Sequence, residues 1–116
     1  MSSGAPPTAP PRPGPRPTPC VRATLHAGAG DLVMPDLMRI GGVTGALQAA
    51  AIAGSAGVPV STHLYPETAA HLMRVTETAH WLEWQDWADP VVAEPFELRD
   101  GHLVIPNRPR QRSCVE

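Results

Sequence analysis

The sequence has no lysine, and arginine accounts for all nine of its basic residues. It has two cysteines, Cys20 and Cys114, which are too few for a disulfide framework and have no metal-binding spacing. No apolar run approaches the roughly 20 residues of a membrane span, and the N-terminus has no apolar core of the signal-peptide type. We therefore expect a soluble, cytoplasmic protein, and its 116 residues are enough for one small domain.

Acidic residues are missing from the first 30 positions, where three arginines carry the only charges. Residues 31–107 then contain ten acids against three arginines, and residues 108–116 return to a balance of +2. The total charge of −2 favours neither nucleic acid nor a membrane as a partner. The chain therefore consists of three compositional blocks.

The first block begins with a tail, residues 1–20, that contains eight of the fifteen prolines. Proline lacks an amide donor and has a fixed φ, so we expect this tail to be disordered or polyproline-II-like, without a helix or an interior strand. Its "PPRPGPRP" run fits two hypotheses. It is either a ligand for an aromatic groove on a partner protein or a solvated tail without a partner.

From residue 31 onward, short and long apolar segments alternate. The short runs at 31–34, 58–62 and 79–83 predict strands, and the longer segments 44–57 and 66–76 have the composition of helices. Alternating strands and helices of these lengths predict βα units with a parallel sheet. The expected fold class is therefore α/β.

Turn and cap residues mark the ends of several of these elements. Thr44 is the expected N-cap of the first helix, and Gly57 is its expected left-handed stop. In "FELRDGHLVIP", Asp100 and Gly101 stand between two alternating segments. Asp-Gly readily takes the positive φ angles of a two-residue turn, so this stretch predicts a β-hairpin.

Three ionisable residues stand at the ends of the three expected strands. Asp36 and His63 each come just after a strand, and Glu83 closes the third one. Parallel strands bring their C-terminal ends to one face, which carries the active site in a (β/α)₈ barrel. We therefore hypothesise that these three residues converge on one catalytic site. The alternative is that each is a solvated polar residue at a strand end.

Other polar and aromatic residues fit structural roles better. Glu67 and His71 share a helical face, but two residues do not make a metal site. Trp81, Trp84 and Trp87 recur at a spacing of three, which favours packing residues over a stacking platform for a ligand.

Five segments resemble the mandelate racemase and muconate lactonizing enzyme family of the enolase superfamily. They occur in that family's order and spacing, and they read "LVMPDLMRIGGVTG", "VPVSTHLYPE", "AHLM", "TAHWLEWQDWADP" and "DGHLVIPNRP". The resemblance implies that residues 21–109 form a partial TIM barrel, made of the last three βα units and a C-terminal β-hairpin. It leaves out the Pro-rich tail and an irregular tail at 110–116.

The resemblance also implies roles for the three strand-end residues. His63 matches the general base that removes the proton next to a carboxylate. Asp36 matches the aspartate that holds the other nitrogen of this imidazole and fixes its tautomer. Glu83 matches a glutamate that, when protonated, donates a hydrogen bond to the enediolate. The implied parent enzyme is a dehydratase or racemase acting on a carboxylic acid or acid sugar.

Enzymes of this family use Mg²⁺, held by carboxylates on the third, fourth and fifth strands. The last of these should fall about two dozen residues before Asp36, in a region without any acid. The family's lysine-bearing second strand and N-terminal capping domain have no match in the sequence either. We therefore expect no metal ligands in this chain and no activity of the chain alone. Three βα units of eight would also leave open strand edges and an uncovered apolar face, so we expect marginal stability.

Three functional hypotheses stay open at this point. The chain is a C-terminal barrel fragment of such an enzyme, a binding module recruited through its Pro-rich tail, or one half of a split enzyme. In the last case a complementing chain or an oligomer would complete it. The Pro- and Arg-rich terminal blocks also fit a shifted reading frame, which translation of the flanking DNA in the other frames would test.

Overall fold

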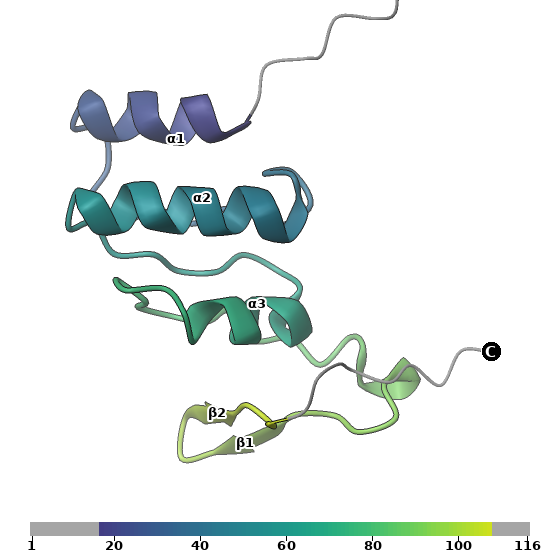
Figure 1. The fold of residues 1–116 in the computed structure, drawn as a ribbon. Helices are drawn as coiled ribbons and strands as arrows, with labels where there is room; N and C mark the ends of the chain where they lie inside the picture. Colours follow the sequence, from purple (N-terminus) through teal and green to yellow (C-terminus); the bar gives the residue numbers. More distant parts are fainter. Residues whose placement is uncertain (1–16, 108–116) are drawn as a thin grey trace, which may run out of the picture.

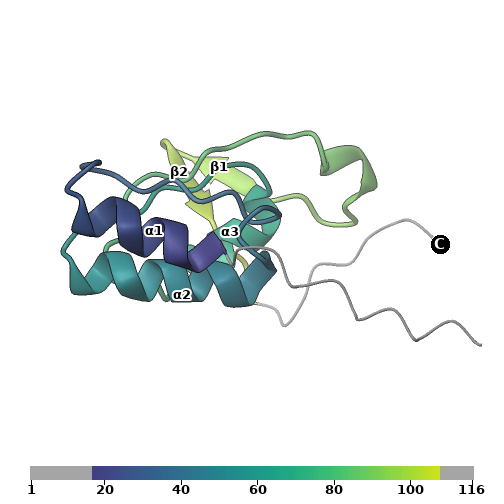
Figure 2. The same ribbon diagram turned by 90° about the horizontal axis from the view of Figure 1, so that it is seen from above.

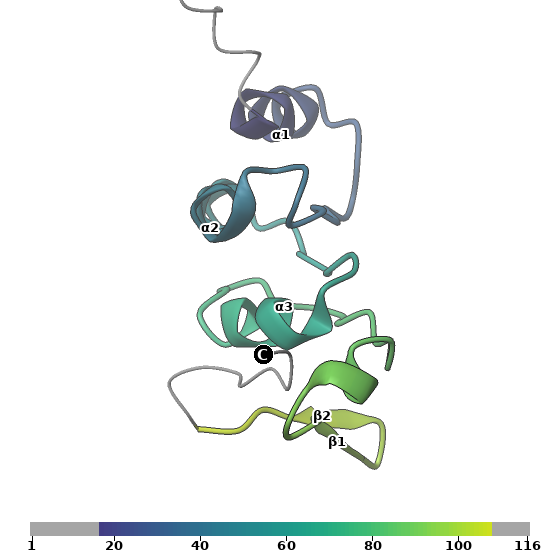
Figure 3. The same ribbon diagram turned by 90° about the vertical axis from the view of Figure 1, so that its right-hand side faces the viewer.

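The computed structural model describes residues 17–107. In chain order the elements are α1 (Pro17–His26), α2 (Gly42–Ser55), α3 (Pro66–Met73), the 3-10 turn η1 (Asp89–Val91), β1 (Glu97–Arg99) and β2 (His102–Val104). The three α-helices lie side by side in one row, with the hairpin beyond α3 (Figure 1). Figures 2 and 3 show the extended connecting segments along one side of this row. The helices therefore cover one face of these segments.

Helix α1 begins inside the proline-rich segment 1–20. Residues 17–20, the last four of this segment, are helical, so the expectation that the segment contains no helix is wrong there. The amides of a first helical turn have no acceptor within the helix, so prolines there remove no hydrogen bond. The remaining predictions for the Pro-rich tail and for the tail 110–116 fall on residues outside the described part of the chain.

The three segments expected as strands lie side by side and parallel, but they are not regular strands. They pair through isolated bridges, Val33 with Val60 and Val60 with Ala79. The Val33 amide donates to the Pro59 carbonyl at 2.9 Å, and the Val60 amide donates to the Thr78 carbonyl at 2.8 Å. The central segment is therefore 58–63, with the other two on either side of it.

Two features explain why these segments do not form continuous ladders. Pro35 and Pro59 have no amide to donate, so the first segment and the central segment each lack one hydrogen-bond donor at these positions. The Thr62 amide also bonds the Trp81 carbonyl at 3.0 Å, one residue later than a regular parallel register would place it. The prediction of neighbouring parallel segments is correct, whereas the prediction of regular strands is wrong.

Helix α2 begins earlier than expected because a glycine turn precedes it. Gly41 is the N-cap with φ 93°, and no side chain caps the helix, so the prediction of Thr44 as N-cap is wrong. Gly57 has φ 65° and follows the helix, as predicted for a left-handed stop. Small residues, Gly45, Ala49 and Ala53, form the buried face at a spacing of four.

Helix α3 and the hairpin agree closely with the predicted positions. Pro66 is the first residue of α3, although the helix ends at Met73 rather than at 76. Asp100 and Gly101 have φ 51° and 75°, the positive values expected of the turn between β1 and β2. Within residues 17–107, no helix is both long and apolar enough to span a bilayer.

The core of the described region is thin and consists largely of alanine. Its larger members are Ile40, Val60 and Phe96, and none of them is completely buried. Trp84 stacks on Phe96 with ring centroids 6.5 Å apart. Packing was therefore the correct expectation for Trp84, but Trp81 and Trp87 are 70% and 76% exposed.

Candidate active site

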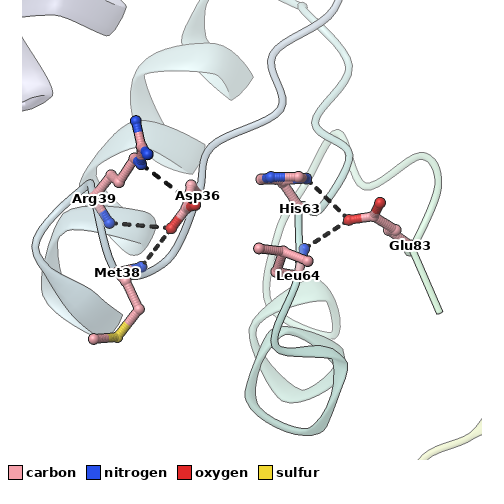
Figure 4. A network of polar contacts seen from close by, with 6 residues as sticks. All are labelled: Asp36, Met38, Arg39, His63, Leu64 and Glu83. Carbon is pink, nitrogen blue, oxygen red and sulfur yellow. Dashed lines mark hydrogen bonds and ion pairs between the residues drawn. The ribbon is translucent and has the colours of Figure 1, made fainter. Parts of the chain in front are cut away.

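His63 and Glu83 form a direct pair at the ends of the central segment and its neighbour. The Nδ1 atom of His63 lies 3.0 Å from Oε2 of Glu83 (Figure 4). Their side chains keep 42% and 33% of their accessible surface. The pair is therefore formed within the chain while remaining open to solvent and to a small molecule.

The residues on both sides of His63 also bond to Glu83. The backbone amide of Leu64 donates to Oε2 of Glu83 at 2.7 Å, and the backbone amide of Glu83 donates to Oγ1 of Thr62 at 3.0 Å. Glu83 is therefore held at its main chain and at its carboxylate by the segment that carries the histidine. Thr62 and Leu64 are not among the site residues predicted from the sequence. The only available signal was a hydroxyl residue directly before the histidine.

The surroundings of Glu83 favour its ionised form. The hydrogen bond from the Leu64 amide is the main reason why the pKa of Glu83 lies below its ordinary value; partial burial opposes this, while His63 and Gln85 lower the pKa further. An ionised carboxylate only accepts hydrogen bonds. In this structure the lowered pKa favours an ionised, accepting Glu83, and the protonated, donating role toward an enediolate stays a prediction.

This charge state determines which imidazole nitrogen is available in the neutral ring. An ionised Glu83 can only accept, so its 3.0 Å contact with Nδ1 assigns the proton of a neutral ring to that nitrogen. The other nitrogen, Nε2, then keeps its lone pair and lies on the side facing Asp36 (Figure 4). The arrangement can therefore accept a proton at Nε2 while the carboxylate stabilises the resulting cation.

Asp36 is a backbone neighbour of this pair but does not orient the imidazole. A parallel bridge joins Asp36 to His63. The Asp36 carboxylate, however, accepts the amides of Met38 and Arg39 at 2.9 and 3.1 Å. Among the described contacts no hydrogen bond joins the Asp36 and His63 side chains, so that expectation is wrong. An aspartate followed by unpaired loop amides readily bonds to them, as in an Asx turn.

The described residues do not fit the family's metal site. Between residues 17 and 107, no three or more His, Cys, Asp or Glu side chains are grouped so that they could hold a metal ion. Mg²⁺ prefers near-octahedral oxygen ligands, usually including one or two carboxylates. Asp36 already accepts two amides, and Glu83 already accepts the Leu64 amide and His63.

Comparison with known families assigns this arrangement to a class of proteins. The enolase C-terminal domain-like family model matches residues 20–109. Solved enolase-superfamily structures share the fold over most of the chain. The chain therefore belongs to the enolase C-terminal domain-like family, whose fold is the TIM barrel.

Particular relatives include acid-sugar dehydratases. L-talarate/galactarate dehydratase from Salmonella typhimurium is 35% identical over 80 residues, which cover 69% of this chain and 20% of the relative. An enolase structure from the alpha proteobacterium BAL199 with bound Mg is 57% identical, with a TM-score of 0.80, over 84% of this chain and 27% of that one. L-talarate dehydratase from Polaromonas sp. JS666, complexed with Mg and L-glucarate, is 30% identical, with a TM-score of 0.72, over 83% of this chain and 26% of that one.

The match covers only part of each relative. The chain spans about a fifth of the curated dehydratase and about a quarter of the two solved structures. The activity of a whole enzyme is therefore not established for this chain by its family.

Proposed function

We propose that this chain supplies the proton-abstracting end of an enolase-superfamily enzyme that dehydrates or racemises an acid sugar. His63 is the general base, Glu83 orients it, and Asp36 stands beside it at the same rim. The observation that carries the proposal is the 3.0 Å contact between Nδ1 of His63 and the ionised Glu83. The three extended segments and their helices correspond to the last three βα units of a barrel.

The chemistry begins with a neutral His63. Its Nε2 accepts the proton from the carbon next to the substrate carboxylate, and the imidazolium is stabilised by the adjacent Glu83 carboxylate. Histidine suits this step because its ordinary pKa lies near neutrality. The Leu64 and Thr62 contacts keep Glu83 in place, so the ring does not have to reorient during the transfer.

The remaining parts of such a site lie outside the described residues. Negative charge that develops on the substrate carboxylate needs electrophilic stabilisation, and the described residues offer no metal-ligand cluster for it. We therefore propose that the chain acts together with the other strands of a barrel, supplied by a complementing chain or by the rest of a longer polypeptide. By itself the chain is expected to be inactive.

A graft into a relative tests this proposal. Residues 20–109 would replace the matching fifth of the Salmonella L-talarate/galactarate dehydratase. We expect the graft to dehydrate galactarate measurably and the isolated chain to be inactive. A His63→Asn graft should lose activity by about 10²-fold or more, because a general base typically contributes that much.

Two results would contradict the proposal. One is a folded graft that binds galactarate but has no activity. The other is a His63→Asn graft as active as its parent. A Thr78→Val graft serves as the control, because the Oγ1 atom of Thr78 is buried and has no hydrogen-bond partner among the described residues.

A further inference from the structure

The hydroxyl of Thr62 is buried and has a specific partner. Only 7% of Thr62 is exposed, and its Oγ1 accepts the backbone amide of Glu83 at 3.0 Å. In a regular ladder a backbone carbonyl would accept such an amide, so a side chain replaces the main chain at this point. The contact therefore fixes the position of the Glu83 main chain.

The turn after His63 depends on the same glutamate. Leu64 and Tyr65 have φ 57° and 51°, although neither is glycine. Left-handed backbone is unfavourable for such residues and persists where surrounding contacts hold it. Here the Leu64 amide bonds the Glu83 carboxylate at 2.7 Å. Glu83 thus holds the strained turn that presents the histidine.

We propose that Thr62 is a positioning residue for the His63–Glu83 pair and acts through the backbone of Glu83. Together the two bonds form a clamp, defined here as Thr62, Leu64 and Glu83, which closes around His63. Loss of the hydroxyl releases the Glu83 main chain, and the carboxylate then moves away from the Leu64 amide and the imidazole. The inference rests on the proposed function only in assigning catalytic importance to the pair.

Hydrogen exchange at the Leu64 amide, measured at single-residue resolution on the full chain, tests the clamp. Thr62→Val keeps the shape of the side chain and removes the acceptor. We expect Leu64 exchange to accelerate about tenfold relative to the Ser61 amide, which bonds the Val33 carbonyl instead. Thr62→Ser keeps an acceptor and should restore slow exchange.

Two further variants separate positioning from general destabilisation. Thr78→Val makes the same change at a buried hydroxyl without a partner among the described residues, and it should leave Leu64 exchange unchanged. In a Glu83→Ala background, where the carboxylate is gone, Thr62→Val should add nothing to Leu64 exchange. The carboxyl ¹³C titration of Glu83 should also show a higher pKa in Thr62→Val, because the bond from the Leu64 amide weakens.

Several outcomes would overturn the inference. They are equal acceleration at Leu64 and Ser61 in Thr62→Val, fast Leu64 exchange in Thr62→Ser, and additive effects in the Glu83→Ala background. None of these readouts requires activity. An inactive graft with an intact clamp would therefore refute the proposed function and leave the clamp in place.

Discussion

At the scale of single residues, one carboxylate performs two tasks next to His63. Oε2 of Glu83 accepts from the imidazole Nδ1 and from the Leu64 amide, at 3.0 and 2.7 Å. The first bond selects the tautomer, and the second holds the turn that carries the ring. A change in the charge of Glu83 should therefore affect both the base and the local fold.

The pH dependence of stability should report this charge. The folded-state pKa of Glu83 is below the ordinary value of 4.5, so its contacts stabilise the fold above about that pH. That contribution is lost as the pH falls through the lowered pKa. Urea unfolding between pH 7 and pH 3 should therefore show a smaller acid loss of stability in Glu83→Gln than in the parent chain.

A matched control for this titration is Glu97→Gln, which removes the same charge from the exposed hairpin, where Glu97 pairs with Arg99 at 2.9 Å. An acid loss in Glu83→Gln as large as that of the parent chain would mean that the carboxylate does not hold the turn.

At the scale of elements, the approach of α2 to the loop after Asp36 positions one side of the site. A Cβ atom at Gly45 would lie 1.7 Å from the carbonyl oxygen of Ile40. The loop between Asp36 and Ile40 therefore lies directly against the helix backbone, where only glycine fits. The Ile40 amide also donates to the Asp36 carbonyl at 2.9 Å.

Gly45→Ala should consequently destabilise the chain, although alanine is the better helix former. Overpacking of this kind costs about 1–3 kcal/mol. Gly54→Ala in the same helix is the matched control, because its Cβ would come no closer than 3.3 Å, to the Glu77 side chain. That variant should be neutral or stabilising by up to about 1 kcal/mol. Urea unfolding of both variants measures the difference, and equal effects would argue against the close contact.

Sequence patterns predicted the elements whose signals are local. Asp-Gly and glycine readily take the positive φ found at Asp100, Gly101 and Gly57, and proline suits the first helical turn at Pro66. These positions could therefore be recognised directly. The start of α2 was mispredicted: Thr44 has the capping side chain, but the turn at Gly41 and Gly42, with φ 93° and 71°, leads into the helix before Thr44. The strand segments were recognised by composition, but their irregular pairing depends on which partner amides are missing.

The site could be predicted only in part for a similar reason. Strand ends placed Asp36, His63 and Glu83 at one rim, and the structure brings His63 and Glu83 together. Which carboxylate orients the imidazole depends on competing donors. The amides of Met38 and Arg39 engage Asp36, and the Leu64 amide keeps Glu83 ionised beside the ring. Spacing along the sequence contains no information about that competition.

At the scale of the whole molecule, the thin core and the exposed aromatics point to an incomplete burial of apolar surface. The buried apolar residues are mostly alanines, whereas Trp81 and Trp87 are 70% and 76% exposed. Extensive exposed apolar surface marks regions that another chain or segment covers. The described region is therefore expected to be stabilised by association.

Thermal unfolding tests this expectation. The purified chain should melt broadly at low temperature and bind a dye specific for exposed apolar surface. Addition of a complementary barrel fragment from a relative should raise the melting temperature and reduce dye binding, because a partner that binds only the folded state stabilises it. A sharp, cooperative melt of the isolated monomer would contradict the account.

The tautomer of His63 is the most direct test of the central claim, that Glu83 orients this imidazole and leaves Nε2 available as the base. ¹⁵N NMR of the histidine-labelled chain, at a pH where histidines are neutral and with His63→Asn for assignment, distinguishes the two ring nitrogens. We expect a proton on Nδ1 and a lone pair on Nε2 of His63. A proton on Nε2 would contradict it.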